Sequence, residues 1–410
     1  MRALITTTPF LSHLWDVVPL GWALRSAGHD VRVAALPNIT EDIVATSLTA
    51  MPAGPLFDTT LVPDWSGQDD GLLPFASTTA RLGGLLAHGL AGKLDDFPPD
   101  LVVHEPLDLA GPIIAQLAGV PAVHVSCGPP YAPRAVQALA KAAASVRRRQ
   151  GWPAEVPPPA LIVDVCPPSY ADPDRRLAGP HQPMRFVPYN GPGAVPDWLR
   201  EPADRPRVCV TMGTGAAGHP LLSRIAAALA SLDVEVVVPA RPDVAAQVAE
   251  AVPAARVVEW LPLKLLLAAG CDLVVHHGGP GTALTALSYG VPQLTVHVHD
   301  HPAAGEHYIN SRLLKACGAS IGLSGRAMTD QDIVDAVRAL MTESGYRAAA
   351  GAMAAEIRAM PSPAATVEVL ERLVGQAQEQ IQTPYQTQAL DQTQALSQIQ
   401  TGRATRPVEA

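Results

Sequence analysis

The chain has 410 residues, of which 48% are hydrophobic and 16% charged, and its formal net charge is -9. This length predicts two domains with a large core, and the acidic balance without basic clusters argues against a nucleic-acid partner. No apolar run is long enough to span a bilayer. The N-terminus does not resemble a signal peptide and the five cysteines form no CxxC pair, so we expect a cytoplasmic protein without disulfides or structural zinc.

The first half alternates short apolar runs with segments of helical spacing. Residues 2–7 and 30–35 read as strands around a helix over 15–27, which is a β-α-β unit and predicts a parallel sheet. Further strands are expected at residues 100–104, 122–126, 161–165 and 186–189, and further helices at 75–94 and 110–117, with a long loop over 52–74.

The second half repeats this alternation after a Pro/Gly-rich boundary over 190–206. Strands are predicted at residues 208–211, 234–238, 255–259, 273–275 and 293–298. We therefore expect an α/β protein with two doubly wound, Rossmann-like domains, 1–195 and 196–362. A helix over 363–380 would pack back on the first domain, and the Gln/Thr-rich residues 381–410 are predicted to be disordered.

A strand, a glycine turn and a helix follow one another in residues 271–292. The turn contains Gly278, Gly279 and Gly281, preceded by His277 and followed by Thr282. A helix N-terminus presents free N–H groups and a partial positive charge, and glycines allow close backbone approach, so the turn is a candidate anion site. The alternative is an ordinary strand-to-helix turn.

A second informative loop, residues 8–13, follows the first strand. Ligands of doubly wound domains bind at the carboxyl ends of the strands. A ligand in the cleft between the two domains would therefore touch both this loop and the glycine turn.

Several motifs together resemble one enzyme family. They are His276–Thr282 followed by Gly290–Leu294, Ser12–His13 before Val18–Arg25, Arg185–Gly193, Thr211–Thr214 and Trp260–Leu263. Residues 1 to about 380 resemble inverting glycosyltransferases of the GT-B fold. The likeness is to actinobacterial antibiotic enzymes that move deoxysugars from dTDP onto polyketide-type aglycones.

The resemblance implies two domains facing across a cleft and a nucleotide site on the second. The pyrophosphate would lie on the helix N-terminus with His277, Gly278, Gly279, Gly281 and Thr282. Gly213 and Thr214 would give a second phosphate contact, and Trp260 would stack on the base beside Leu261 and Leu263. His276 is expected to be a strand-end histidine with a structural partner. Because no DxD-like pair ends a second-domain strand, we expect no metal and no cofactor beyond the donor substrate.

Thr285 bears on the choice of nucleotide. Related UDP-sugar enzymes carry a glutamate eight residues after the phosphate histidine, where it holds the ribose hydroxyls, and this chain has Thr285 there. A buried carboxylate would be under-satisfied on a deoxyribose. Threonine therefore favours dTDP-sugars, with UDP-sugars as the alternative.

His13 is the candidate general base, since the family's catalytic histidine lies in this loop and histidine titrates near neutral pH. A carboxylate would orient its ring. Glu105 best matches the family's aspartate, and Asp108 is the alternative.

The chain departs from the family after Pro292. The acidic-Gln pair that holds the sugar corresponds either to Glu306 and His307 or, by distance, to Asp300 with the next residue. The histidines at 297, 299 and 301 suggest a metal site less well than a solvated loop. Trp65, Phe75 and Phe57 are candidates for the acceptor pocket.

The function expected from this resemblance is transfer, with inversion, of a sugar from dTDP to a small-molecule aglycone in antibiotic-type secondary metabolism. Three alternatives stay open: a UDP-sugar-dependent transferase, a sugar-nucleotide 2-epimerase, and a non-catalytic helper subunit that binds nucleotide or aglycone. Intact His13, Glu105 and His277 argue against the helper. The sequence does not decide whether the chain forms a homodimer or needs an auxiliary activator protein.

Overall fold

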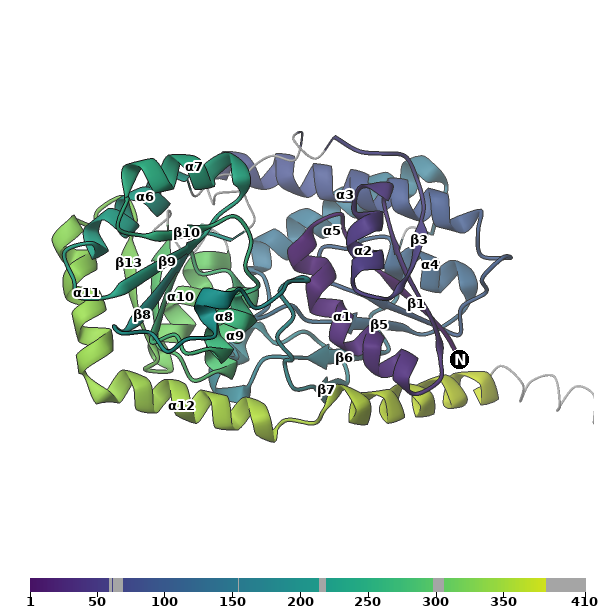
Figure 1. Cartoon of the computed structure of the whole chain (residues 1–410). Helices are drawn as coiled ribbons and strands as arrows, with labels where there is room; N and C mark the ends of the chain where they lie inside the picture. The colour runs from purple at the N-terminus through teal and green to yellow at the C-terminus, as the bar shows by residue number, and fades with distance from the viewer. Residues whose placement is uncertain (59–60, 62–68, 154, 214–218, 298–305, 381–410) are drawn as a thin grey trace, which may run out of the picture.

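The computed structural model describes residues 1–58, 61, 69–153, 155–213, 219–297 and 306–380. The predicted disordered tail lies outside these residues. Two parallel sheets, each flanked by helices, stand side by side in the described part of the chain (Figure 1). None of its helices is both long and apolar enough to cross a membrane.

The first sheet has the order β3-β2-β1-β4-β5-β6-β7, and every described pairing in it is parallel. Its strands are β1 (Arg2–Thr6), β2 (Asp30–Ala35), β3 (Thr49–Pro52), β4 (Leu101–His104), β5 (Ala122–Val125), β6 (Leu161–Asp164) and β7 (His181–Pro183). The helices of this half are α1 (Leu11–Ser26), α2 (Thr40–Ala45), α3 (Asp69–Ala91), α4 (Gly111–Ala118) and α5 (Pro133–Gln150).

The second sheet has the order β10-β9-β8-β11-β12-β13 and is also parallel throughout its described pairings. Its strands are β8 (Arg207–Thr211), β9 (Glu235–Pro239), β10 (Arg256–Val258), β11 (Leu273–His276), β12 (Gln293–His297) and β13 (Ser320–Ser324). Its helices are α6 (His219–Leu229), α7 (Pro242–Ala251), α8 (Leu263–Ala268), α9 (Pro280–Ser288), α10 (Glu306–Ala316), α11 (Asp330–Thr342) and α12 (Ser344–Ala359). Short 3-10 helices lie at Pro37–Ile39, Pro168–Tyr170, Pro173–Arg175 and Asp197–Leu199.

The core explains why both sheets read as apolar runs. In β1, Ala3 and Ile5 face a cluster with α1, whereas Leu4 faces a second cluster with α3 and α4. Burial on both faces removes the polar alternation of a half-exposed strand. The first cluster continues into α9 and α12 of the second half, so apolar packing joins the two halves.

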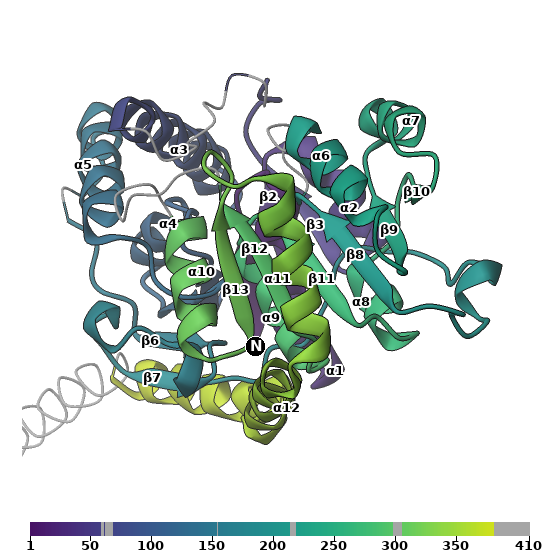
Figure 2. The ribbon, with the colours of Figure 1, turned by 90° about the vertical axis from the view of Figure 1, so that its left-hand side faces the viewer.

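The C-terminal helices cross under both sheets (Figures 1 and 2). α12 lies beneath the second sheet, and the helix over 363–380 returns beneath the first. Val367, Leu370 and Val374 of this last helix are buried in the cluster that contains α1 and β1. The helix over 363–380 therefore packs on the first half through these apolar side chains.

The structure corrects the sequence prediction at several places. No strand forms at 186–189; Phe186 and Tyr189 are buried in the core instead, and the last strand of the first sheet is β7. The apolar run there reflects burial without strand pairing. β3, β13 and α5 were not predicted, and α3 begins at Asp69, inside the segment expected to be a loop.

Candidate active site

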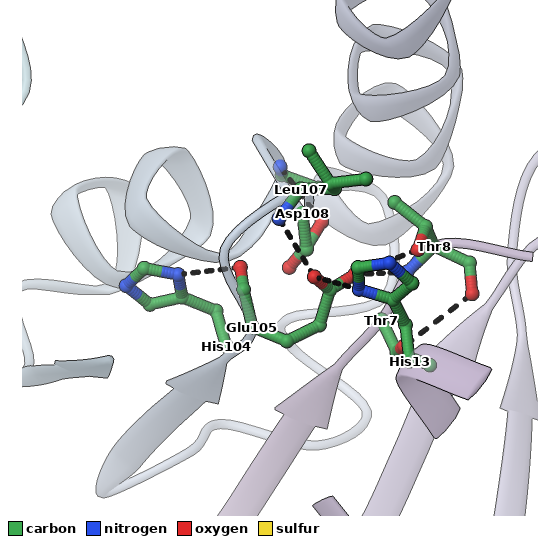
Figure 3. Close-up of polar contacts among 8 residues, drawn as sticks. Thr7, Thr8, His13, His104, Glu105, Leu107 and Asp108 are labelled. Carbon is green, nitrogen blue, oxygen red and sulfur yellow. Dashed lines mark hydrogen bonds and ion pairs between the residues drawn. The ribbon is translucent and has the colours of Figure 1, made fainter. Parts of the chain in front are cut away.

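His13 and Glu105 come together at the centre of the first sheet. Glu105 directly follows β4, and His13 lies in the first turn of α1, just after β1. β1 and β4 are neighbours with Thr6 opposite His104, and the connections from them run to opposite sides of the sheet. Such a switch point opens a crevice at the carboxyl edge. Here Nδ1 of His13 lies 2.8 Å from Oε2 of Glu105 (Figure 3).

Glu105 is fully buried, and both of its oxygens accept hydrogen bonds. Oε1 accepts from N (2.9 Å) and Oγ1 (2.7 Å) of Thr8, and Oε2 accepts from N of Leu107 (2.7 Å) as well as from His13. Burial by itself raises the pKa of Glu105, but the charge of His13 and these hydrogen bonds outweigh it and lower the pKa to about 2. Glu105 is therefore a carboxylate at neutral pH.

A carboxylate only accepts hydrogen bonds, so Nδ1 of His13 must be the donor. In the neutral ring the other nitrogen, Nε2, then has no proton and is the basic atom. The side chain of His13 is 14% exposed, whereas that of Glu105 is 0% exposed. The arrangement is that of a general base whose tautomer is set by a buried carboxylate.

Asp108, the alternative to Glu105 as the carboxylate that orients His13, bonds to backbone N–H groups instead. Its Oδ1 accepts from N of Ala110 (2.9 Å) and its Oδ2 from N of Gly111 (3.0 Å), at the start of α4. Burial, followed by the charge of Glu105, raises its pKa to about 7. The structure thus gives Asp108 a helix-capping position and places Glu105 on His13.

Cys127, which the sequence analysis did not connect to any site, lies beside His13 and Glu105. Ligand-type atoms of His13, Glu105 and Cys127 all lie within 4.8 Å of one another. These residue types are zinc ligands, yet both carboxylate oxygens of Glu105 already accept hydrogen bonds from protein groups. The donor set therefore fits the orientation of an imidazole better than the ligation of a metal.

The loop after β5, which contains Cys127, contacts the second half of the chain at Gly128. A Cβ on Gly128, whose φ is +150°, would lie 2.4 Å from Cβ of Pro280. Pro280 is the first residue of α9, so the His13 cluster and the glycine turn belong to one site.

The glycine turn joins β11 to α9 as predicted. Gly279 is the N-cap of α9 and no side chain caps the helix, which leaves its first N–H groups without intrahelical acceptors. A Cβ on Gly281 would meet nothing within 4 Å, so this side of the turn is open. Thr282 is half-buried in the first helical turn. The turn has the free donors and the open approach that an anion needs.

His277 lies between this turn and the loop after β8, the neighbouring strand. A Cβ on Gly279 would lie 2.6 Å from Nε2 of His277, and a Cβ on Gly213 would lie 2.7 Å from its Cε1. Its Nδ1 is buried without a hydrogen-bond partner in the described part of the chain. Burial, and then the neighbouring His307 and His276, hold the pKa of His277 well below its usual range, so the ring is neutral. A neutral imidazole still has one N–H to donate.

His276 and His307 support His277 in different ways. Nε2 of His276 lies 2.8 Å from Oε1 of Gln293, and its Nδ1 accepts from N of Gly278 (3.2 Å), so His276 has structural partners as expected. The rings of His307 and His277 stand edge to face, with centroids 4.6 Å apart. His307 therefore packs directly on the ring of His277.

Trp260 is 48% exposed and meets Trp15 of α1, with ring centroids 5.8 Å apart. Its Nε1 donates to O of Pro192 (2.8 Å). Leu261 and Leu263 are buried in an apolar cluster that also contains residues of α8 and α9. A cavity of about 230 Å³ borders Trp260 and is lined by Leu11, Trp15, Asp42, Pro192 and Trp260.

Thr285 does not face the cleft. It is fully buried, its Oγ1 donates to O of Gly281 (2.7 Å), and it accepts from Nδ2 of Asn190 (3.2 Å). The hydroxyl of Thr285 therefore has protein partners, one of them the linker residue Asn190, and its contact with the ribose stays a prediction.

The residues predicted to line the acceptor pocket lie in different environments. Phe75 of α3 packs against a small apolar cluster that includes Leu107, two residues after Glu105. Phe57 is buried in the apolar cluster between α3 and the first sheet. Thr214, Asp300, Trp65 and the side chain of Glu306 lie outside the described residues.

Sequence reasoning also missed Trp15 and Asn190. Trp15 is two residues past His13 on α1, and Asn190 directly precedes the Gly191–Pro192 turn. The signals that could have singled them out are the place of Trp15 beside His13 and the place of Asn190 within the Arg185–Gly193 motif. Their contacts appear once the two halves are packed together.

Family models and a curated relative match most of the chain. Residues 22–83 and 76–213 match the family model "Erythromycin biosynthesis protein CIII-like, N-terminal domain", and residues 223–373 match that of the C-terminal domain. The chain is 36% identical to L-demethylnoviosyl transferase of Streptomyces niveus, over 90% of this chain and 97% of that protein.

Solved structures show the same architecture. Glycosyltransferase SsfS6 of Streptomyces sp. SF2575, complexed with thymidine diphosphate, is 31% identical with a TM-score of 0.74, over 91% of this chain and 99% of its own. Spinosyn rhamnosyltransferase SpnG is 31% identical to this chain with a TM-score of 0.76. The match covers 90% of this chain and 100% of the SpnG chain. The chain therefore belongs to the erythromycin biosynthesis protein CIII-like family, and it is an antibiotic-type glycosyltransferase of the GT-B fold.

Proposed function

We propose that the protein transfers a deoxysugar from a dTDP-sugar, with inversion and without a metal, to a hydroxyl group of a small-molecule aglycone. The observation that carries the proposal is the 2.8 Å contact between His13 and the ionised Glu105, next to the open N-terminus of α9. One half supplies a base and the other a site for the leaving pyrophosphate.

The chemistry is a single displacement. Nε2 of His13 takes the proton of the acceptor hydroxyl while the acceptor oxygen bonds to the anomeric carbon. The bond from that carbon to the phosphate oxygen breaks, and dTDP leaves with the electron pair. Attack opposite the leaving group inverts the anomeric centre. The carboxylate of Glu105 stabilises the imidazolium that forms.

The departing diphosphate would be held by the first N–H groups of α9, His277 and Thr282. This arrangement offers donors and a helix dipole where negative charge develops. Trp260 would stack on thymine, and His307, with Glu306 or Asp300, would meet the sugar. SsfS6 and SpnG were each solved with thymidine diphosphate, which supports dTDP over UDP for this chain.

The acceptor would approach from the first half, beside Phe75 and the segment that contains Trp65. The nucleotide sugar is then a substrate, and no further cofactor is required. The five cysteines all lie in the described residues and form no disulfide, which fits a reducing compartment, so we place the protein in the cytoplasm.

Incubation with dTDP-deoxysugars and a panel of macrolide and aromatic polyketide aglycones tests the proposal. We expect a glycosylated aglycone by mass spectrometry and one dTDP released per sugar transferred. Equal turnover of UDP- and dTDP-sugars would contradict the donor assignment. Binding of dTDP without product from any donor and acceptor would favour the helper subunit.

A further inference from the structure

The linker between the two halves is fastened to the nucleotide-facing helices by Asn190. Its Oδ1 accepts from N of Lys264 (3.0 Å), in the first turn of α8, where backbone N–H groups have no intrahelical acceptor. Asn190 thus does for α8 what an N-cap residue does, although it lies 74 positions away.

The other end of the same amide reaches α9. Nδ2 of Asn190 donates to Oγ1 of Thr285 (3.2 Å), and Oγ1 of Thr285 donates to O of Gly281 (2.7 Å). Gly281 belongs to the first turn of α9, where the pyrophosphate is proposed to bind. A chain of hydrogen bonds therefore links that turn to the linker.

The next two linker residues contact the aromatic pair. Pro192 accepts from Nε1 of Trp260, and Gly191 has a φ of +85°. A Cβ on Gly191 would lie 2.8 Å from Cζ2 of Trp260 and 3.1 Å from Cζ2 of Trp15. The linker is thus packed between a tryptophan of the second half and one of α1 in the first half.

These contacts give the linker a function beyond connection. We propose that Asn190, acting through Thr285, is a positioning residue that fixes the linker, and with it Trp15 and α1, against the nucleotide site. Nucleotide at the N-terminus of α9 then tightens the packing of α1 on Trp260. This positions His13 relative to the anomeric carbon of the donor sugar. This inference rests on the proposed function, because it takes the nucleotide to be the ligand.

Hydrogen exchange of the full chain with and without dTDP measures this coupling. In the unmodified protein, dTDP is expected to slow exchange in residues 277–284 and also in residues 10–16 and 186–193. Thr285→Val keeps the shape of the side chain and removes its hydroxyl. This variant is expected to keep the protection of 277–284 and to lose that of 10–16.

Turnover gives a second measurement. A small misplacement of the base lowers kcat strongly, so Thr285→Val is expected to lower kcat about tenfold while its dTDP affinity, measured by calorimetry, changes little. Thr285→Ser restores the hydroxyl and is expected to restore both the kcat and the protection of 10–16.

Thr366→Val is the matched control. Thr366 is also fully buried and also donates from Oγ1 to a carbonyl four residues earlier, that of Ser362, far from the linker in the sequence. It should leave the dTDP-induced protection unchanged. If Thr285→Val does not fold, Asn190→Ala at the half-buried linker position serves the same purpose.

Two results would overturn the proposal. One is a Thr285→Val or Asn190→Ala variant in which dTDP still protects residues 10–16 as in the unmodified chain. The other is a fall in kcat that Thr285→Ser does not reverse. Failure of the unmodified protein to bind dTDP would instead refute the proposed function, and this inference with it.

Discussion

Nδ1 of His13 and Oε2 of Glu105 lie 2.8 Å apart although the two residues are 92 positions apart in the chain. The contact forms because β1 and β4 are neighbours in register, with Thr6 opposite His104. Glu105 is fully buried and accepts two further hydrogen bonds from Thr8 and one from Leu107, so its position is fixed before a substrate arrives. These hydrogen bonds also hold the ring of His13 in one orientation, which the proposed role as a base requires.

Replacement of His13 by alanine should remove the base without disturbing the nucleotide site. General base catalysis contributes about 10²–10⁴-fold, so we expect kcat to fall by that factor. Affinity for dTDP should stay nearly unchanged, because the residues of the glycine turn are intact. Steady-state kinetics and calorimetry measure the two quantities. Turnover close to that of the unmodified enzyme would show that another group is the base.

Replacement of Gly128 by alanine should wedge the two halves apart. The new Cβ would collide with Pro280, the first residue of α9. We expect kcat to fall about tenfold or more, because the base moves away from the donor. The measurement is kcat with a saturating donor.

Gly119→Ala is the control that separates the effect of the collision with Pro280 from the effect of backbone strain at a glycine with positive φ. Gly119 also has a positive φ, of +67°, but a Cβ there would meet nothing within 4 Å. Both variants carry backbone strain of about 1–3 kcal/mol, and only Gly128→Ala should lose activity beyond its loss of stability. Equal kinetic defects would contradict the predicted contact between the halves.

Replacement of His277 by alanine should weaken diphosphate binding selectively. A hydrogen bond to a charged group contributes about 1.5–3 kcal/mol, so we expect dTDP affinity to fall about 10- to 100-fold. Thymidine lacks the diphosphate, and its affinity should not change. Calorimetric titration with both ligands makes the comparison, and an equal loss for thymidine would place His277 outside the phosphate site.

Buried neutral histidines should make the fold sensitive to acid. Burial is the main cause that lowers the pKa of His104 to about 4 and that of His124 to about 3, from an ordinary value of 6.5. The unfolded chain therefore binds more protons than the folded one below about pH 6.5. The stability that these groups provide is present above that pH and is lost as the pH falls through the folded-state values.

His124→Asn should flatten this dependence. Removal of one such group should reduce the slope of the unfolding free energy by up to about 1.4 kcal/mol per pH unit between pH 6 and 4. Urea titrations at several pH values measure the slope. His88→Asn, at an exposed position, is the control and should leave it unchanged. Parallel slopes for all three proteins would contradict the buried neutral state of His124.

Much of the fold could be predicted from local patterns. β2 matches its predicted range, and β8, β11 and β12 differ from theirs by about a residue, because continuous apolar runs bounded by turns are typical of strands buried on both faces. The same criterion failed at Phe186 and Tyr189, which are apolar because they fill the core between elements. It also missed β3 and β13, in which polar residues, a proline or a glycine interrupt the apolar run.

The sequence by itself determined the two α/β halves and the glycine turn before α9, because strand and helix periodicity and the conformational freedom of glycine are local properties. Its resemblance to a glycosyltransferase family singled out His13 and His277 as candidates. Only the tertiary structure decided that Glu105, and not Asp108, meets His13, that Cys127 joins them, and that Thr285 binds the linker residue Asn190. These contacts join residues far apart in the chain, and they depend on strand order, register and the packing of the two halves. No local pattern encodes them.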